Sequence, residues 1–365
     1  MALSRRAFLK TSAGAAAASS MLPALGVCSS QPAQGAEPSY SPLNKWPGRL
    51  VNNYNRAATD NLKANREIIV AMVNDAVTLL TGEKDVGAAW KSIFPKELTT
   101  ESEIAIKINI LNPKYPPHPF VVVGIVEGLK SMQIDGKSFP ASGIYIYDSN
   151  NRSTFEQAGF LKEYFPGVTM NHHGKMQRDF GDGAHNNTPY VETLNKCDYL
   201  INVPGLRGHS GYAGKVTLGF KSHYGTYPPL YHNKDTQPFL CDINCTGPVF
   251  KKTVLTVFGA IFGLKEGHGP RGDADSYLSY TKKIDAATTN PAPNTVLMST
   301  DPVTAEFQAI KIMRMRDNRP FTVESMPAYL RSSAGVPAGL DVNYNIGIIE
   351  EEKMDIRRIV NGKRV

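Results

Sequence analysis

Residues 104–132 read IAIKINILNPKYPPHPFVVVGIVEGLKSM. The first seven of them alternate apolar and polar side chains, a pattern that is typical of a β-strand. A proline-rich turn follows, and the apolar residues from Pro119 to Met132 then predict a helix. A strand that leads through a turn into a helix is the repeating unit of a parallel sheet with helices packed on it.

The same alternation of strand and helix signals extends outward from this stretch. Apolar residues at helical spacing predict a helix over 64–81, and Asp301 followed by Pro302 predicts a capped helix over 302–315. We therefore expect an α/β fold, a mainly parallel β-sheet with helices on both faces, in one body or in two lobes. The other predicted elements are strands over 144–147, 199–203 and 295–298, helices over 153–165 and 190–196, and an apolar run over 249–262.

The first 35 residues resemble a secretion signal. Residues 4–10, SRRAFLK, match the twin-arginine pattern, and a short stretch rich in Ala and Ser follows them, with small residues near its end. We expect cleavage near residue 35, passage through the twin-arginine translocase in the folded state, and a periplasmic or otherwise extracytoplasmic location. Residues 36–62, rich in Pro, Ser and Asn, predict a linker or extended arm, and residues 63–365 predict the α/β domain.

Composition narrows the class of protein. A chain with 41% hydrophobic and 20% charged residues is typical of a globular protein. The net charge of +7 comes without a long basic run, so we expect no nucleic-acid partner. No stretch after the leader reaches the roughly 18 consecutive apolar residues of a membrane span, so we expect no stable membrane insertion.

Three cysteines follow the leader, namely Cys197, Cys241 and Cys245. Their number and spacing do not fit a ferredoxin-type site, so we expect no iron–sulfur cluster. Cys241 and Cys245 are four residues apart, and the sequence leaves open whether they form a disulfide or remain two separate buried thiols.

Polar segments follow several of the predicted strands, at the edge where ligands bind to sheets of this class. Lys107 lies within the first of these strands, where a lysine must reach an edge of the sheet or point into a polar cavity. Asp148, at the end of the next strand, is either a metal ligand or general base, or the cap of the helix that follows. The polar segments are residues 112–118, 148–152, 204–210 and 299–301.

Histidines and glycines concentrate in the middle of the chain. All eight histidines lie between His118 and His268, and histidine is both a common metal ligand and an acid–base group near neutral pH. Residues 205–225 contain six glycines, and exposed backbone amides beside cations are typical of a pocket for carboxylate or phosphate. The alternative is a solvated surface loop. The cations and histidines of this segment and its continuation are Arg207, His209, Lys215, Lys221, His223 and His232.

A second glycine-rich loop spans residues 263–272 and contains Glu266, Gly267 and Gly269. It follows an apolar run that predicts a buried strand. The loop is therefore either a second part of the same site or a simple connection between elements.

Together these segments resemble the DUF362 family, a domain family of unknown function. The resemblance covers roughly residues 100–350. The family pattern has an aspartate before the Ala-Ile pair of the strand that leads to the second glycine-rich loop, and this chain has Gly259 at that position. Some members carry ferredoxin-type cysteine clusters, which this chain lacks. The resemblance rests on KINILNPKYPPHP, IYDSNNRS, INVPGLRGHS, GFKSHYGTYP with His232, GLKEGHGPRG and STDPVTAE. It implies that the site residues are among the matching positions Lys107, Asn109, Asp148, Lys221, His223, His232, Glu266, Gly267, Gly269, Pro270, Asp301 and Pro302.

We expect these residues to form one site for a small anionic substrate, in a metal- or cofactor-dependent enzyme of redox or isomerisation chemistry. The alternatives are a non-catalytic protein that carries a metal or ligand for an exported redox partner, and a structural role in the envelope. The predicted ligands of a divalent metal are His223, His232 and Asp148. The predicted catalytic residues are Lys107, Asp148, Lys221, His223 and His232, and the predicted ligand- or cofactor-binding residues are Arg207, His209, Glu266, Gly267 and Gly269.

The leader yields a direct test. Replacing Arg5 and Arg6 together by lysine should leave the full-length precursor in the cytoplasm, because the translocase reads the arginine pair. Immunoblots of cytoplasmic and periplasmic fractions measure this, with the wild-type chain as the control. Unchanged mature protein in the periplasm would contradict the assignment of the leader.

Overall fold

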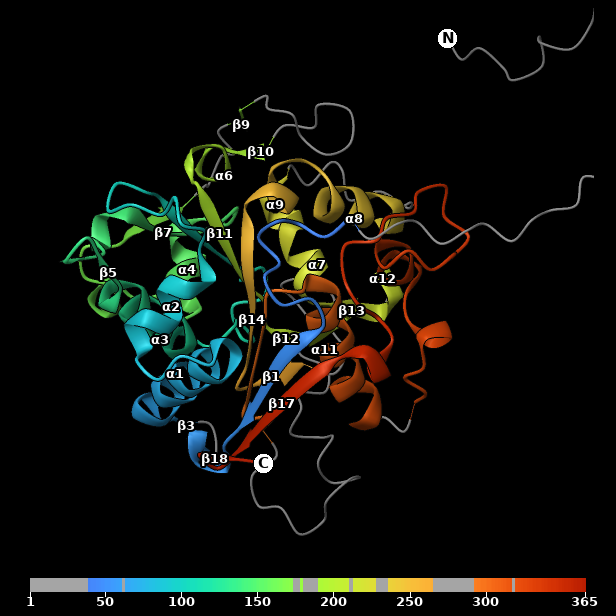
Figure 1. Cartoon of the computed structure of the whole chain (residues 1–365), viewed down its shortest axis with the longest axis horizontal. Coiled ribbons are helices and arrows are strands. Elements are labelled where there is room, and N and C mark those ends of the chain that lie inside the picture. The colour runs from blue at the N-terminus through green and yellow to red at the C-terminus, as the bar shows by residue number, and fades with distance from the viewer. Residues whose placement is uncertain are drawn as a thin grey trace, which may run out of the picture. The chain divides into compact units, whose positions relative to one another are not determined.

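A sheet of nine strands forms the centre of the computed structural model, in the order β18–β17–β1–β16–β14–β11–β4–β7–β8 (Figure 1). The structure describes residues 39–60, 63–172, 178–179, 190–209, 213–227, 236–264, 292–316 and 319–365. The strands of this sheet are β1 (Arg49–Tyr54), β4 (Ile104–Ile108), β7 (Ile144–Asp148), β8 (Thr169–His172), β11 (Tyr199–Val203), β14 (Thr253–Ala260), β16 (Thr295–Ser299), β17 (Asp355–Val360) and β18 (Lys363–Arg364).

Most neighbouring strands run parallel, which confirms the predicted fold class. Strands β8, β7, β4, β11 and β14 pair in parallel, as do β1 and β17. Strand β16 runs antiparallel to both β14 and β1, and β18 runs antiparallel to β17. The segment 299–301 therefore leaves the sheet at the edge opposite the carboxyl ends of β4 and β11, and the prediction that it joins the other polar segments there is wrong.

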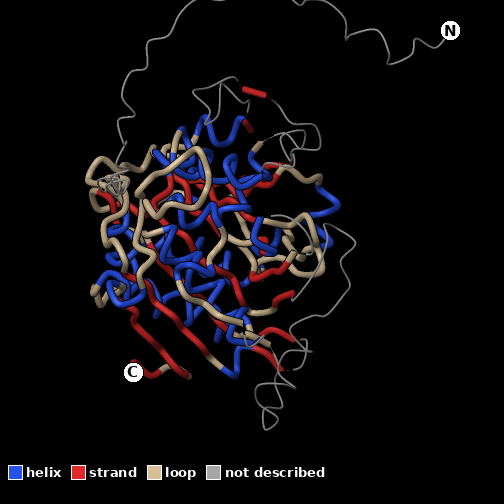
Figure 2. The backbone as a smooth tube through the Cα atoms, turned by 90° about the vertical axis from the view of Figure 1, so that its right-hand side faces the viewer, coloured by secondary structure: helices blue, strands red, loops and turns tan. Residues whose placement is uncertain are grey.

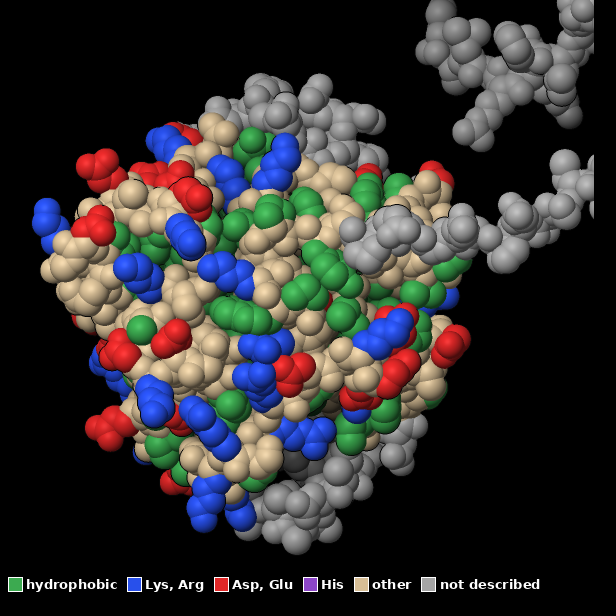
Figure 3. Space-filling view, viewed as in Figure 1, with side chains coloured by type: hydrophobic (Ala, Val, Ile, Leu, Met, Phe, Trp, Pro, Cys, Tyr) green, Lys and Arg blue, Asp and Glu red, His purple; other side chains and the backbone are tan. Residues whose placement is uncertain are grey.

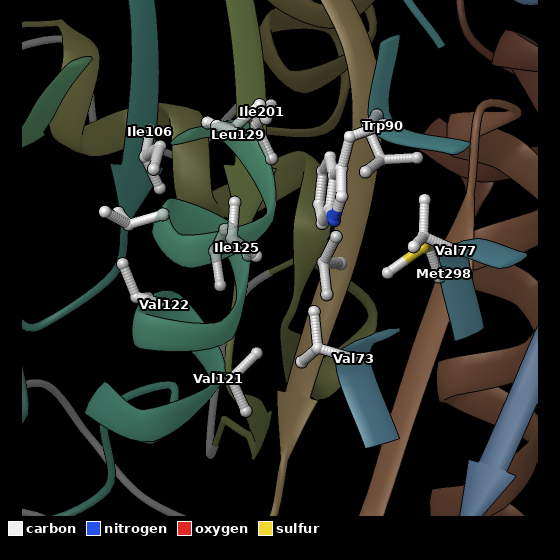
Figure 4. Close-up of a cluster of buried hydrophobic side chains, with 14 of the residues drawn as sticks. Val73, Val77, Trp90, Ile106, Val121, Val122, Ile125, Leu129, Ile201 and Met298 are labelled. Atoms are coloured by element: carbon white, nitrogen blue, oxygen red, sulfur yellow. The ribbon is translucent and has the colours of Figure 1, made fainter. Parts of the chain in front are cut away.

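One face of the sheet is covered by α1 (Arg66–Thr81), α2 (Val86–Ile93) and α3 (Pro119–Ser131). Figure 4 shows the apolar side chains of α1, α2 and α3 packed on those of the strands, with Trp90 at the centre. Two glycines of α3 allow this close packing. A Cβ atom at Gly128 would lie 1.9 Å from Nε1 of Trp90, and one at Gly124 would lie 3.0 Å from Cβ of Val73.

A second layer of helices covers the other face. In Figure 1 most of this layer lies to the right of the strands, and Figure 2, turned by 90°, views that side from outside. Among the described residues, no helix has both the length and the apolar composition needed to cross a bilayer. The helices of this layer include α6 (Glu192–Lys196), α7 (Gly219–Ser222), α8 (Thr236–Cys245), α9 (Gly247–Lys252), α11 (Pro302–Arg316) and α12 (Ala328–Ser333).

Most predicted elements are present, with three differences in detail. The helix expected over 153–165 is α4 (Arg152–Gln157) followed by a 3₁₀ turn at Lys162–Tyr164, because Gly159 between them has φ +80°. The segment 190–196 begins with the short strand β10 (Tyr190–Val191) before α6. The apolar run over 249–262 divides into the end of α9 and strand β14.

The prediction of a linker over residues 36–62 is wrong for much of its described part. Arg49–Tyr54 is strand β1, which pairs with β16 on one side and with β17 on the other. The amide of Asn53 in this strand donates to the carbonyl of Met72 at 2.9 Å, which links the strand to α1. A polar composition that would suggest a solvated linker here belongs to a strand inside the fold. The described residues beyond 36 form one unit rather than two lobes.

The cysteines are free and buried. Cys241 and Cys245 lie one turn apart on α8, where Cys241 donates to the carbonyl of Tyr329 at 3.1 Å and Cys245 donates to Oγ of Ser333 at 3.2 Å. Burial raises the pKa of Cys241 to about 11, so the thiol is protonated at neutral pH. The structure therefore resolves the open alternative in favour of two separate thiols.

Asp301 holds three distant segments together. As predicted it caps α11, because its Oδ1 accepts from the amides of Val303 and Thr304 at 3.0 Å each. Its Oδ2 accepts from the amide of Gly48 at 2.9 Å and from that of Ile348 at 3.0 Å. Burial raises the pKa of this carboxyl, and the four amide donors oppose the increase.

Asp301→Asn should destabilise the protein by about 3 kcal/mol, since the substitution replaces charge-assisted hydrogen bonds and points an N–H group at amide donors. Urea unfolding at pH 7 measures the change in the free energy of unfolding. Asp341→Asn at an exposed position is the control and should change it by less than about 0.5 kcal/mol. Equal values for the two variants would show that Asp301 does not hold these segments.

Candidate functional site

The pairing of five neighbouring strands in the central sheet places one polar residue of each strand in a single row. The direct partners are Tyr147 with Lys107, Lys107 with Asn202, Asn202 with Thr256, and Thr256 with Ser299. Directly paired residues project from the same face of a sheet. This row therefore crosses the face that α7, α8 and α11 cover, where β4 and β11 end.

Lys107 and Asp148 form a buried ion pair within this row. Nζ of Lys107 donates to Oδ2 of Asp148 at 2.8 Å and to the carbonyl of Ile108 at 2.6 Å. The side chains of the pair are 0% and 2% exposed. The lysine thus points into a polar interior rather than to an edge, which was one of the two alternatives for its position.

The other oxygen of Asp148 accepts from the backbone amide of Asn150 at 3.1 Å and also from the Asn150 side chain. The cap of α4 is Asn151, whose Oδ1 accepts from the amide of Thr154 at 3.0 Å. The alternative that Asp148 is a helix cap is therefore excluded, and the carboxylate is joined to the polar row through Lys107.

Arg207 reaches this site from a small sheet beyond the carboxyl ends of β11 and β14. Strand β12 (Leu206–Gly208) pairs with β13 (Val216–Thr217) and with β15 (Gly263–Leu264). The guanidinium of Arg207 is buried and donates from Nη2 to the carbonyl of Asn109 at 3.1 Å. Its Nε has no hydrogen-bond partner among the residues that the structure describes.

Lys221 on α7 and His223 just after it add two further basic groups. Burial and, to a smaller extent, the charge of Arg207 lower the pKa of Lys221 to about 8. Burial and the charge of Lys107 lower the pKa of His223 to about 3, so its imidazole is neutral. Burial also lowers the pKa of Lys107 and that of Arg207, the latter to about 10, while Asp148 opposes both decreases.

A glycine lets the backbone that follows His223 approach the ion pair. A Cβ atom at Gly225 would lie 2.9 Å from Nζ of Lys107 and 3.0 Å from Oδ2 of Asp148. The turn His223–Thr226 therefore packs directly on the ion pair. The structure thus brings together Lys107, Asp148, Arg207, Lys221 and His223, all of them predicted site residues.

Sequence analysis missed Glu306 on α11. Its Oε2 accepts from the amide of Phe220 at 3.3 Å, and its Oε1 accepts from the hydroxyl of Tyr329 at 2.6 Å. The carboxyl thus caps the first turn of α7, which carries Lys221. Burial raises its pKa to about 7. The available signal was a single acidic residue within an otherwise apolar face of the helix that Asp301 begins.

Other predicted residues are elsewhere or outside the described part. His209 follows β12, and its amide donates to the carbonyl of Lys215 at 2.8 Å. His118 caps α3, and burial lowers its pKa to about 4. Predicted positions that lie outside the described residues are His232, Glu266, Gly267, Gly269 and Pro270.

The predicted metal set of His223, His232 and Asp148 cannot be assembled from the described residues, because His232 is not among them. The described part of the chain contains no group of three or more His, Cys, Asp or Glu side chains arranged to hold a metal ion. The carboxylate of Asp148 already accepts from Lys107 and Asn150.

A family model described as a domain of unknown function, DUF362, matches residues 104–311. The chain belongs to this family. No curated protein matches it in sequence. The DUF362 match begins at β4 and ends within α11, so it includes the polar row as far as Ser299, together with Glu306. Strands β1, β17 and β18 lie outside it, although they complete the same sheet.

The structure gives a reason for Gly259 in this DUF362 chain. A Cβ atom there would lie 3.0 Å from Cβ of Pro117 and 3.2 Å from the amide nitrogen of His118. Any larger side chain would displace the loop between β4 and α3. At this position the chain has close packing of backbone segments in place of a carboxylate.

Asp148→Asn should destabilise the protein by about 3–5 kcal/mol, because it leaves the buried ammonium of Lys107 without its counter-charge. Urea unfolding at pH 7 measures this. The control is Glu127→Gln, which removes the exposed ion pair of Arg66 and Glu127 and should cost less than about 1 kcal/mol. A cost for Asp148→Asn no larger than the control would contradict the described burial of the pair.

Proposed function

We propose that the protein binds a small anion, a carboxylate or a phosphate ester, in the space bordered by Lys107, Arg207 and Lys221. The observation that carries the proposal is the local balance of charge. Lys107 pairs with Asp148, the charge of Asp148 also acts on Arg207, and the charge of Arg207 acts on Lys221, while burial lowers the pKa of each cation. Surplus positive charge in a poorly solvated space is unfavourable unless an anion compensates it.

Hydrogen bonding supports the same ligand class. Nε of Arg207 is a buried donor with no partner in the described part of the chain, while Nη2 is bound to Asn109. A guanidinium presents its donors in a planar fork that matches the oxygens of carboxylate and phosphate. A free donor in that fork is therefore better suited to an oxyanion than to a neutral ligand.

A divalent metal fits this cluster less well. A cation placed beside Asp148 would meet the charges of Lys107 and Arg207 at short range in a medium of low effective dielectric constant. A metal site at this position would require further acidic or imidazole ligands from residues beyond those described. We accordingly place the substrate's negative charge, rather than a metal ion, at the centre of the site.

The basic groups also support acid–base chemistry on the bound anion. With a pKa of about 8, Lys221 can both donate and accept a proton near neutral pH. His223 is neutral and has an unprotonated ring nitrogen. Proton transfer in the isomerisation of a small acid is the enzyme class that these groups favour. A carrier that holds the same anion without turnover is the second candidate, and the uncompensated charge supports it equally.

The excess positive charge on which this proposal rests lies in the interior of the protein and not on its surface. On the face in Figure 3, Lys and Arg side chains are interspersed with Asp and Glu, as on an ordinary protein surface. Action on an extracytoplasmic anion, after export by the twin-arginine route, belongs to the same proposal and rests on the leader sequence.

Anion binding should depend on pH through Lys221. With sulfate as the probe, affinity measured by calorimetry should fall as the pH rises from 7 to 10, because Lys221 loses its proton. Lys221→Met should weaken binding at pH 7 by about tenfold and remove this part of the pH dependence. Lys221→Arg should keep binding strong at pH 10, since arginine stays charged.

Lys84→Met, at an exposed position, is the matched control and should bind sulfate as the wild type does. Absence of saturable sulfate and malonate binding by the wild-type protein would overturn the proposal. Equal affinities in all four proteins would show that the anion binds elsewhere.

A further inference from the structure

A cavity bordered in part by His223 is lined by neither residue of the ion pair. It is bordered by the segment before β1 (Ser41 and Asn44), by β11 and β14 (Asn202 and Thr256), and by His223 itself. The centre of a water-sized sphere can occupy about 20 Å³ of this cavity, which leaves room for one or two water molecules. Part of the remaining wall is apolar and comes from Phe220, Val249, Phe250 and Ile346.

Three of the residues around this cavity carry a buried polar atom without a partner in the described structure. They are Nδ2 of Asn44, Oδ1 of Asn202 and Nδ1 of His223. The three side chains are all more than nine-tenths buried, with 7%, 3% and 1% exposure. Leaving a buried polar group without a hydrogen bond costs about 1–3 kcal/mol, so three such groups around one small space require an explanation.

The other polar atoms of Asn44 and Asn202 are bound and fix the two side chains. Oδ1 of Asn44 accepts from Oγ1 of Thr300 at 3.0 Å, and Nδ2 of Asn202 donates to the carbonyl of Gly219 at 2.9 Å. Reversing the Asn202 amide would break its bond to a carbonyl, so the unpaired acceptor of Asn202 is a consequence of the surrounding structure. The Thr300 hydroxyl can donate or accept, so either orientation of Asn44 leaves one atom of its amide without a partner.

We propose that this cavity is a binding site for a water-sized neutral molecule that both donates and accepts hydrogen bonds, with water as the occupant. The molecule accepts from Asn44, donates to Asn202, or bonds to Nδ1 of His223, and satisfies at least two of the three. A neutral ligand is required, because the imidazole is uncharged and no charged side chain borders the cavity. Cavities of this size lined by convergent polar groups hold ordered water.

The site is distinct from the anion site, although His223 borders both. Its Nδ1 lacks a partner, and the charge of Lys107 acts on the same ring. A molecule held in the cavity is thus placed beside the imidazole of His223 without contact with either residue of the ion pair. This inference stands on the cavity and its unpaired atoms, and it does not require that an anion binds.

The test is a high-resolution crystal structure of the mature wild-type protein, with a second data set from a crystal under xenon pressure. We expect a discrete solvent peak within about 3.2 Å of polar atoms from at least two of Asn44, Asn202 and His223. We expect no xenon there, because xenon enters dry apolar cavities. An empty cavity, bound xenon, or direct hydrogen bonds among the three side chains would overturn the proposal.

A matched pair of variants at Thr256 adds a control. Thr256→Val keeps the volume of the side chain and should retain the solvent peak, whereas Thr256→Leu adds bulk to the wall and should remove it. Sulfate binding in the wild type is measured separately. A solvent peak without sulfate binding would refute only the anion site, and sulfate binding with an empty cavity would refute only this one.

Discussion

A fully buried ammonium group is the constraint to which the rest of the site responds. Burying an unpaired charge costs several kcal/mol, so Lys107 in β4 requires a carboxylate within hydrogen-bonding distance. Asp148 can provide it because β7 pairs directly with β4 and ends one residue after Tyr147, the partner of Lys107. The glycine at 225 then lets a turn from a distant part of the chain close over the pair. One desolvated charge thus fixes the relative positions of two strand ends and a turn.

Two buried carboxylates, which accept hydrogen bonds from backbone amides, position the helix that carries Lys221. Glu306 caps the first turn of α7, and Asp301, five residues earlier, joins α11 to segments near both ends of the described chain. Because both acids lie on one helix, the position of Lys221 is coupled to the segment that borders the cavity beside His223. Rigid placement of this kind keeps basic side chains from moving toward solvent, where their charge would be more stable.

Local patterns were sufficient for elements whose signal lies within one segment. The helices near 64–81, 119–132 and 302–315 were predicted because apolar spacing and capping residues specify them locally. Strand β1 and the direction of β16 were not predicted, because β1 pairs with residues more than 200 positions away and β16 is placed between β1 and β14 by pairings outside its own segment. The polar composition of 36–62 concealed a strand whose Asn53 donates a hydrogen bond to α1, a contact that no local pattern encodes.

The candidate site was found through charge rather than through the clustering of histidines. His118 caps a helix and packs against Phe120 and Phe262, and His172 packs on Phe155, so the dense histidine region reflects several unrelated positions. Lys107 was informative because a cation within an apolar strand has few stable environments, and each of them requires specific partners. Asn202 and Glu306 gave no such signal, since an amide in a strand or an acid in a helix has many ordinary roles. Their importance comes from register and from contact with α7, which are properties of the assembled sheet and not of any one segment.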